Sequence, residues 1–131
     1  KKEDLINFYR NTIKEFGLEP IEDSMGYVLS GGQRRKVEIA RCLASKPKII
    51  LLDEPFAGID PLAIQDIKNV LKSLSDKGIC ILITDHNLRE TIDICNYSIV
   101  IKDGSILDKG EKDYLINSSL IKEEYFGTVF D

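Results

Sequence analysis

Two neighbouring carboxylates, Asp53 and Glu54, are the first candidates for chemistry in this sequence. They follow the apolar run 49–52, which has the length of a β-strand, so both acids emerge where that strand ends. Asp53 is placed to hold Mg²⁺, directly or through water, because this cation prefers carboxylate and water oxygens. Glu54 could orient or deprotonate an attacking water. The alternative is a strand end whose acids are merely solvated or cap the next turn.

A second candidate is the stretch Ser30-Gly31-Gly32-Gln33, which opens a predicted helix. Ser30 is a favourable N-cap, and two glycines in the first turn leave the backbone N–H groups accessible. Because the N-terminus of a helix attracts anions, a phosphate could approach closely here. The alternative is an ordinary serine cap with glycines that serve a tight turn.

The third candidate is His86, the only histidine among the 131 residues. It stands just after a second apolar strand. From there its imidazole could reach the bound phosphate and form a bridge between that phosphate and Glu54. The alternative is a histidine that makes a structural hydrogen bond.

The elements that must position these groups follow from hydrophobic periodicity and from turn residues. Helices are expected over residues 5–16, 30–45, 61–77 and 88–95, with two short helices over 111–126. Strands are expected over 48–52, 79–84, 97–102 and 105–109, the last two joined by a hairpin turn at Asp103-Gly104. We expect Asp60 to cap the helix 61–77, with Pro61 in its first turn.

This order of elements indicates an α/β fold in which the strands 48–52 and 79–84 pair in parallel. Their apolar residues occupy consecutive positions, so we expect both faces of each strand to be buried. The carboxyl ends of parallel strands are where ligands gather, which would bring Asp53, Glu54 and His86 together. The helix 30–45 is expected to bury one face, made of Val37, Ala40, Leu43 and Ala44.

Composition excludes several classes of function. Hydrophobic residues make up 43% and charged residues 31%, which is typical of a globular chain rather than a disordered one. The formal net charge of −4 argues against binding nucleic acid through its phosphates. No apolar run reaches the roughly 18 residues that a membrane-spanning helix requires. The cysteines Cys42, Cys80 and Cys95 form no C-x-x-C pair, and we expect them to be reduced thiols that pack as small buried hydrophobes.

The motifs, taken in their order along the chain, resemble those of the ATP-binding-cassette (ABC) ATPases. Residues 29–33 resemble the signature motif of this family, and residues 49–54 resemble its Walker B strand with the catalytic glutamate. Residues 57–60 resemble the D-loop, and His86 resembles the switch histidine.

The resemblance implies a fold class: the C-terminal portion of a P-loop NTPase, an ABC-type nucleotide-binding domain, with part of its helical subdomain. Residues 1–47 would be the remainder of the helical subdomain with the signature motif. Residues 48–131 would be the later half of the RecA-like core with a C-terminal helical tail. The family's Walker A loop is missing, since no Gly-Lys-Ser or Gly-Lys-Thr occurs in the 131 residues. We therefore expect this chain alone to be inactive.

The resemblance also implies roles for the candidate residues. Glu54 and His86 would be catalytic, Asp53 would hold magnesium, and the ATP-binding residues would be Ser30, Gly31, Gly32, Gln33 and Asp60. The ATPase subunits of this family work as head-to-tail dimers, in which the signature helix of one subunit presses on the γ-phosphate held by the other. Asp60 would couple the two sites.

Within the family, residues 53–61 and 84–91 are most similar to the ATPases of bacterial lipopolysaccharide exporters. ATPases of branched-chain amino-acid importers and non-transport ABC ATPases are the alternatives. Transmembrane permease subunits would be the partners, and the ATPase would lie on the cytoplasmic side of the inner membrane. The aromatic residues of the tail, Tyr125, Phe126 and Phe130, either pack back on the domain or help to hold the dimer together.

Overall fold

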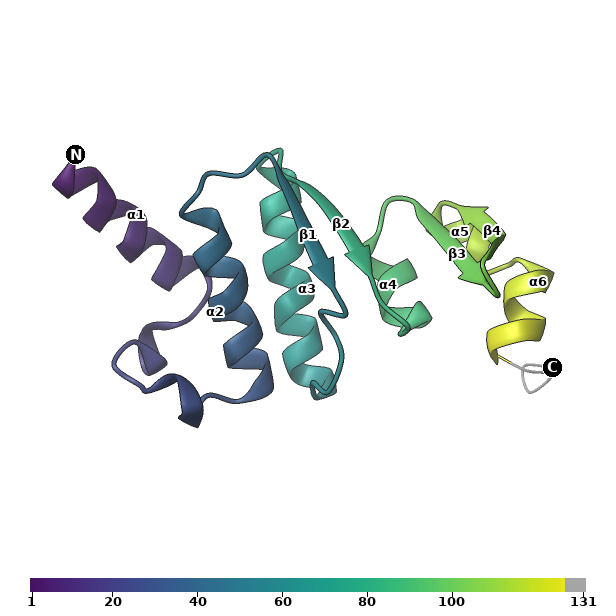
Figure 1. The fold of residues 1–131 in the computed structure, drawn as a ribbon, viewed down its shortest axis with the longest axis horizontal. Coiled ribbons are helices and arrows are strands. Elements are labelled where there is room, and N and C mark those ends of the chain that lie inside the picture. Colours follow the sequence, from purple (N-terminus) through teal and green to yellow (C-terminus); the bar gives the residue numbers. More distant parts are fainter. Residues whose placement is uncertain (127–131) are drawn as a thin grey trace. The chain divides into compact units, whose positions relative to one another are not determined.

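The computed structural model describes residues 1–126 of the chain, which forms two compact units, Lys1–Thr84 and Asp85–Asp131 (Figure 1). The expected α/β class is confirmed, with β1 (Ile49–Asp53) and β2 (Cys80–Thr84) in the first unit. The expected division at residues 47 and 48 concerns a complete nucleotide-binding domain and stays a prediction. No helix within residues 1–126 has the length and hydropathy needed to cross a membrane.

The first helix, α1 (Lys2–Glu15), ends at Phe16, and Gly17 follows with φ +60°, as expected of a glycine after a helix. None of the residues of α1 is buried, whereas Phe16 and Leu18 just beyond it are. Glu15, the last residue of α1, contacts α3 (Pro61–Asp76) and Lys77, which follows α3. The Glu15 carboxylate accepts a hydrogen bond from Ser73 Oγ at 3.0 Å and pairs with the Lys77 ammonium.

Two short 3₁₀ turns, Glu19–Ile21 and Gly26–Val28, lead to α2 (Gly31–Leu43). Ser30 caps α2 as expected, in a reciprocal arrangement with Gln33. The expected buried face of α2 was partly wrong. Its buried residues are Gly32, Ile39 and Leu43; Val37 and Ala40 are half-buried, and Ala44 is exposed.

The close approach of α2 and α3 explains that difference. A Cβ added at Gly32 would lie 2.5 Å from the Cβ of Ala63, so only glycine fits where the two helices meet. The contact turns the Gly32 side of α2 toward α3, and Ile39 and Leu43 are buried with it. Helix α3 is capped by Asp60, whose carboxylate accepts from the Ala63 amide at 3.0 Å, as expected.

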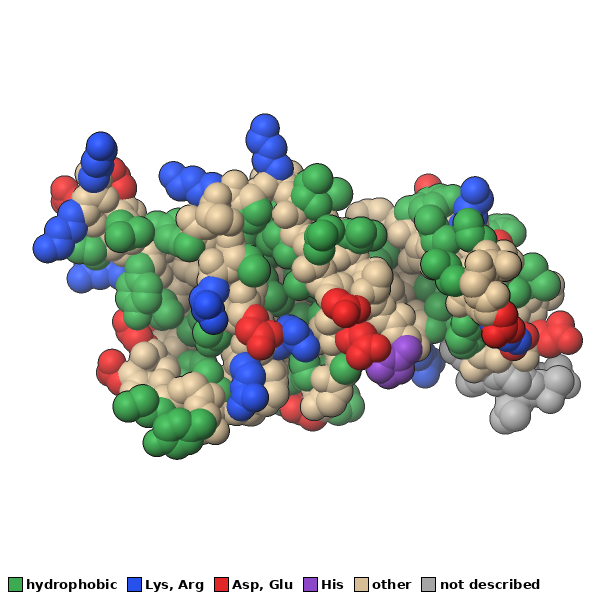
Figure 2. All heavy atoms as spheres, viewed as in Figure 1, with side chains coloured by type: hydrophobic (Ala, Val, Ile, Leu, Met, Phe, Trp, Pro, Cys, Tyr) green, Lys and Arg blue, Asp and Glu red, His purple; other side chains and the backbone are tan. Residues whose placement is uncertain are grey.

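The strands β1 and β2 pair in parallel, in a register that runs from Ile49 opposite Cys80 to Asp53 opposite Thr84. The expectation that both faces of these strands are buried was wrong. Ile50 is buried, but Ile49 and Leu51 are 61% and 72% exposed, and Leu82 is 58% exposed. Hydrophobic side chains therefore lie open over β1 and β2 in Figure 2. Apolar residues make a strand suitable for burial. A face of the sheet is buried only where another element packs over it.

The expectation that the cysteines are buried was also wrong. Cys42 and Cys80 are exposed, and Cys95 is half-buried. Burial raises the pKa of the Cys95 thiol, while a hydrogen bond with Ser98 acts in the opposite direction.

The second unit is a hairpin with short helices. It contains α4 (Leu88–Ile94), β3 (Ser98–Lys102), β4 (Ser105–Gly110), α5 (Lys112–Leu115), α6 (Ser119–Ile121) and a π-helical turn (Lys122–Phe126). The antiparallel hairpin turns at Asp103 and Gly104, both with positive φ, as the sequence predicts. The core of this unit is made of Ile92, Val100, Leu115 and Ile121.

The start of the aromatic tail lies against the hairpin. The hydroxyl of Tyr125 donates to the carbonyl of Ile101 at 3.4 Å, and Glu124 pairs with Lys102. For Tyr125 this agrees with packing back on its own unit. The side chain of Phe126 and the whole of Phe130 lie outside what the structure describes.

The fit of Gly32 against α3 predicts the effect of an added methyl group. Gly32→Ala should lower the free energy of unfolding by about 1–3 kcal/mol because it overpacks the contact. Gly31→Ala is the matched control, since its Cβ would be no closer than 3.5 Å to any neighbour. Adding Ala63→Gly to Gly32→Ala should recover most of the loss. Urea unfolding measures all three variants, and equal stability of the two single variants would contradict the assignment.

The pairing of Glu15 predicts a pH-dependent contribution to stability. The hydrogen bond from Lys77 holds the pKa of Glu15 below its ordinary value, against an opposing effect of burial. The folded state is therefore favoured above the unfolded pKa, and this contribution is lost as pH falls through the lower, folded pKa. Glu15→Gln should lower stability at pH 7 by no more than about 1 kcal/mol, because the pair is partly exposed.

Urea unfolding over a pH series checks this expectation. The difference between the wild type and Glu15→Gln should shrink toward acid pH. In Lys77→Gln, the further change Glu15→Gln should have less effect at neutral pH. A difference that stays constant down to the most acid pH would refute the proposed pairing.

Candidate functional site

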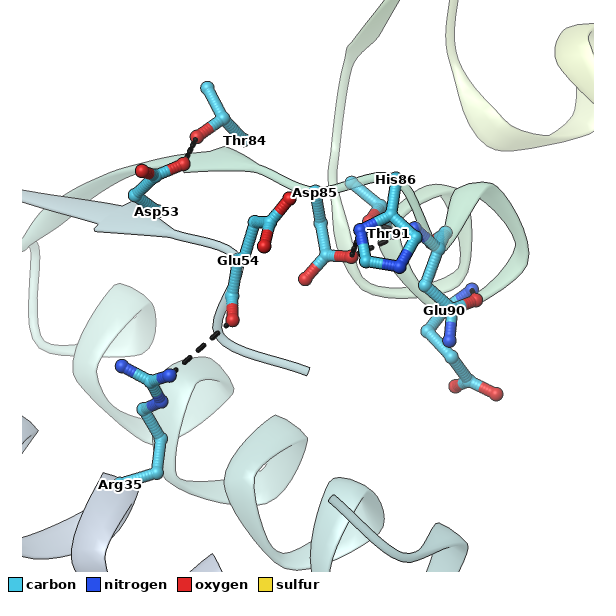
Figure 3. A network of polar contacts seen from close by, with 9 residues as sticks. Arg35, Asp53, Glu54, Thr84, Asp85, His86, Glu90 and Thr91 are labelled. Atoms are coloured by element: carbon cyan, nitrogen blue, oxygen red, sulfur yellow. Dashed lines mark hydrogen bonds and ion pairs between the residues drawn. The ribbon is translucent and has the colours of Figure 1, made fainter. Parts of the chain in front are cut away.

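The carboxylate of Asp53 stands at the end of β1, beside the end of β2. The Thr84 hydroxyl donates to Asp53 Oδ1 at 2.7 Å, because the parallel register places these two residues opposite each other (Figure 3). Asp53 is exposed, which leaves its carboxylate within reach of a ligand. The strand thus places a carboxylate oxygen, which could act as a ligand atom, at the edge of the sheet.

The backbone of Glu54 is held in an unusual conformation. Its φ is +48°, in the left-handed region that costs a non-glycine residue about 1–3 kcal/mol. The Glu54 amide donates to the Thr84 carbonyl at 2.6 Å, which extends the pairing of β1 and β2 by one bond. The Glu54 carbonyl accepts from the Ala57 amide at 3.2 Å and from Arg35 Nη2 at 3.4 Å. After Glu54 the chain enters the core with the buried Pro55 and Phe56.

The start of α2 lies next to the loop that precedes α3. A Cβ built on Gly31 would lie 3.5 Å from the carbonyl oxygen of Gly58 and 3.9 Å from the side chain of Ile59. The structure therefore brings together two stretches, 30–33 and 57–60, that the sequence presents as separate motifs.

The side chains of Ser30 and Gln33 are used in the cap of α2. Gln33 Oε1 accepts from the Ser30 amide at 2.9 Å, and Ser30 Oγ accepts from the Gln33 amide at 3.2 Å. Gly31 is exposed, whereas Gly32 is buried against Ala63. For Gly32 the structure gives a packing reason, and Gly31 is the glycine at which a ligand could reach the backbone.

His86 belongs to the second unit, two residues beyond β2. Its side chain is 72% exposed, while that of Asp85 is fully buried, and their Nδ1 and Oδ1 atoms lie 3.8 Å apart (Figure 3). Asp85 Oδ1 also accepts from the Asn87 amide at 2.8 Å, and Asn87 in turn caps α4. That His86 reaches the phosphate contacted by Glu54 stays a prediction.

Arg35 also lies at this site and is not among the site residues predicted from the sequence. Its guanidinium contacts the Glu54 carbonyl and also pairs with Glu38 at 2.8 Å. The signal was available, because Arg35 lies three residues after Gly32 and hence on a neighbouring part of the same helix face. What the sequence did not reveal is that Glu54 lies within reach of that face.

Residues 1–126 contain no cluster of three or more His, Cys, Asp or Glu side chains that could hold a metal ion. Magnesium is commonly held by one or two carboxylates together with water and substrate phosphates. The exposed carboxylate of Asp53 fits that donor set.

Comparison with known proteins gives consistent matches. The family described as ABC transporter matches residues 4–57. The lipopolysaccharide export system ATP-binding protein LptB of Haemophilus influenzae is 48% identical over 118 residues, which are 90% of this chain and 49% of that protein. LptB of Escherichia coli strain K12 is 45% identical over 130 residues, 99% of this chain and 53% of that protein. The chain thus spans about half the length of these relatives.

Solved structures agree with these matches. The ADP conformation of MJ1267, an ATP-binding cassette of an ABC transporter, superposes with a TM-score of 0.82 at 32% identity. It is matched over 97% of this chain and 52% of its own. The protein cbiO1 from Clostridium perfringens, part of the ABC transporter complex cbiONQ, gives a TM-score of 0.80 at 30% identity. That match covers 88% of this chain and 47% of the other.

The fold, the arrangement of the motifs and these matches agree with one another. Over nearly its whole length, the chain is similar to the ATP-binding proteins of ABC transporters, including those named LptB.

Proposed function

We propose that this chain is part of an ATP-hydrolysing subunit of an ABC transporter. The observation that carries the proposal is the end of β1. There Asp53 is fixed by Thr84, and Glu54 is held in a left-handed turn within reach of the signature helix α2. Strained backbone of this kind is frequent at active sites, where it aims a side chain that acts on a substrate.

The helix α2 would provide the contact to the γ-phosphate of ATP. Its capping box uses the side chains of Ser30 and Gln33, so the backbone at Gly31 and the positive end of the helix dipole are the groups that face the phosphate. The neighbouring loop 57–60, with Asp60 at the start of α3, would sense the same contact. In a head-to-tail dimer this phosphate belongs to the nucleotide held by the other subunit.

Asp53 and Glu54 would have different roles. Asp53 would hold magnesium, which when bound neutralises the charge of the phosphates. Glu54 would orient the attacking water and accept its proton, and His86 would contact the γ-phosphate. Binding of ATP would favour the closed dimer because the nucleotide contacts more groups there.

The proposed cargo is lipopolysaccharide. This step rests on the relatives named LptB, which are 44–48% identical over at least 90% of the chain. The partners would be transmembrane permease subunits, with the ATPase dimer on the cytoplasmic face of the inner membrane. Residues 1–47 would then belong to the helical subdomain and residues 48–131 to the nucleotide-binding core.

Replacement of Glu54 tests the catalytic assignment. In the complete protein that carries this segment, Glu54→Gln should lower the rate of ATP hydrolysis by about 10²–10⁴-fold because the water loses its base. ATP affinity should be retained, since the amide keeps the shape of the side chain. Phosphate release and equilibrium binding of a fluorescent ATP analogue measure the two quantities.

Glu19→Gln is the matched control, because Glu19 is an exposed acid in a 3₁₀ turn and undergoes the same chemical change. It should hydrolyse ATP at the wild-type rate. The isolated 131-residue chain should show no turnover above that of its own Glu54→Gln variant. A complete Glu54→Gln protein with normal turnover would overturn the role given to Glu54.

The cargo is tested with the membrane partners. The complete protein is captured from its native membranes, and its permease subunits are identified by mass spectrometry. When this complex is placed in lipid vesicles, lipopolysaccharide should raise ATP turnover, because cargo engages the transport cycle. Leucine is the control for the branched-chain importer alternative. Stimulation by leucine and not by lipopolysaccharide would exclude the proposed cargo.

A further inference from the structure

Arg35 connects the signature helix to the backbone of the proposed catalytic residue. Its Nη2 donates to the Glu54 carbonyl at 3.4 Å (Figure 3). Its Nη1 donates to Glu38 Oε2 at 2.8 Å. The Nε atom of Arg35 is buried and has no hydrogen-bond partner among the described residues. Both terminal nitrogens of the guanidinium therefore have a partner, and the Arg35 side chain is 28% exposed.

The Glu54 carbonyl is the group through which this contact acts. It also accepts from the Ala57 amide at 3.2 Å, and the Glu54 amide is bonded to Thr84 at 2.6 Å. Hydrogen bonds on both sides of Glu54 hold a conformation, with φ +48°, that a non-glycine residue does not adopt without support. Loss of a charged donor from one side would let this backbone relax and change the direction of the side chain.

We infer that Arg35 is a positioning residue for Glu54, which couples the position of α2 to the orientation of the catalytic carboxylate. This inference rests on the proposed ATPase function. In the dimer, α2 contacts the nucleotide of one site and Glu54 serves the other, so Arg35 links the two sites within one subunit. The planar guanidinium suits this task, because one end holds Glu38 on the same helix while the other reaches the carbonyl.

The test compares variants of α2 in the complete protein. Arg35→Ala should lower kcat for ATP hydrolysis by about tenfold or more, the effect expected for loss of a hydrogen bond to a charged group. The KM for ATP should change by less than about twofold, because ATP binding and the fold are retained. Arg35→Lys keeps the charge and should restore part of kcat. Cooperativity between the two sites should fall with kcat in Arg35→Ala.

Two controls separate this role from a structural one. Arg34→Ala removes the same charge from the neighbouring exposed position and should leave kcat unchanged. Glu38→Gln removes the ion pair but keeps the contact with Glu54, and should reduce kcat less than Arg35→Ala does. Hydrogen exchange at the Ala57 amide provides a readout independent of turnover, and should be faster only in the Arg35 variants.

The outcomes are distinct. If Arg35→Ala matches Arg34→Ala in both turnover and exchange, the inference is wrong. If instead it loses ATP affinity and thermal stability, and Arg35→Lys restores nothing, Arg35 is only structural and the inference is again wrong. Absence of ATP hydrolysis by the wild-type protein would reject the proposed function, while the exchange experiment would still decide whether Arg35 holds the Glu54 backbone.

Discussion

The hydrogen bond from the Glu54 amide to the Thr84 carbonyl, 2.6 Å long, is the contact on which the site depends. It adds one more bond to the parallel pairing of β1 and β2 beyond the last residues of the strands. The pairing aligns Asp53 with Thr84, and the extra bond fixes where the chain leaves the sheet. Because Glu54 then turns into a left-handed conformation, two consecutive acids are separated in direction and can take different tasks.

The contact between α2 and α3 also helps to position the residues of the site. Gly32 lets the two helices approach so closely that a methyl group would meet Ala63, and this proximity fixes the start of α2 beside the loop 57–60. The two glycines at the start of α2 thus serve different physical purposes. Gly32 is required by packing, whereas Gly31 is exposed and leaves the backbone accessible to an anion.

The errors of prediction have a common cause. Apolar residues on β1 and β2 predicted burial of both faces, yet Leu51 is 72% exposed. Cys42 and Cys80 were expected inside and are exposed. In each case the residue is of a type that is often buried. It is buried only where another layer of the protein packs over that position. The same holds for α2, where the contact of Gly32 with Ala63 accompanies burial of Ile39 and Leu43, while the apolar Ala44 is exposed.

Local signals were sufficient for most of the helices and strands. The capping box at Ser30, the cap at Asp60 and the turn at Asp103-Gly104 each depend on side chains and dihedral angles close in sequence, so the sequence by itself determined them. The contact of Arg35 with Glu54 joins residues 19 positions apart and depends on how α2 packs near the end of β1. That contact, and the left-handed turn it supports, were decided only by the tertiary structure, because no local preference favours positive φ at a glutamate.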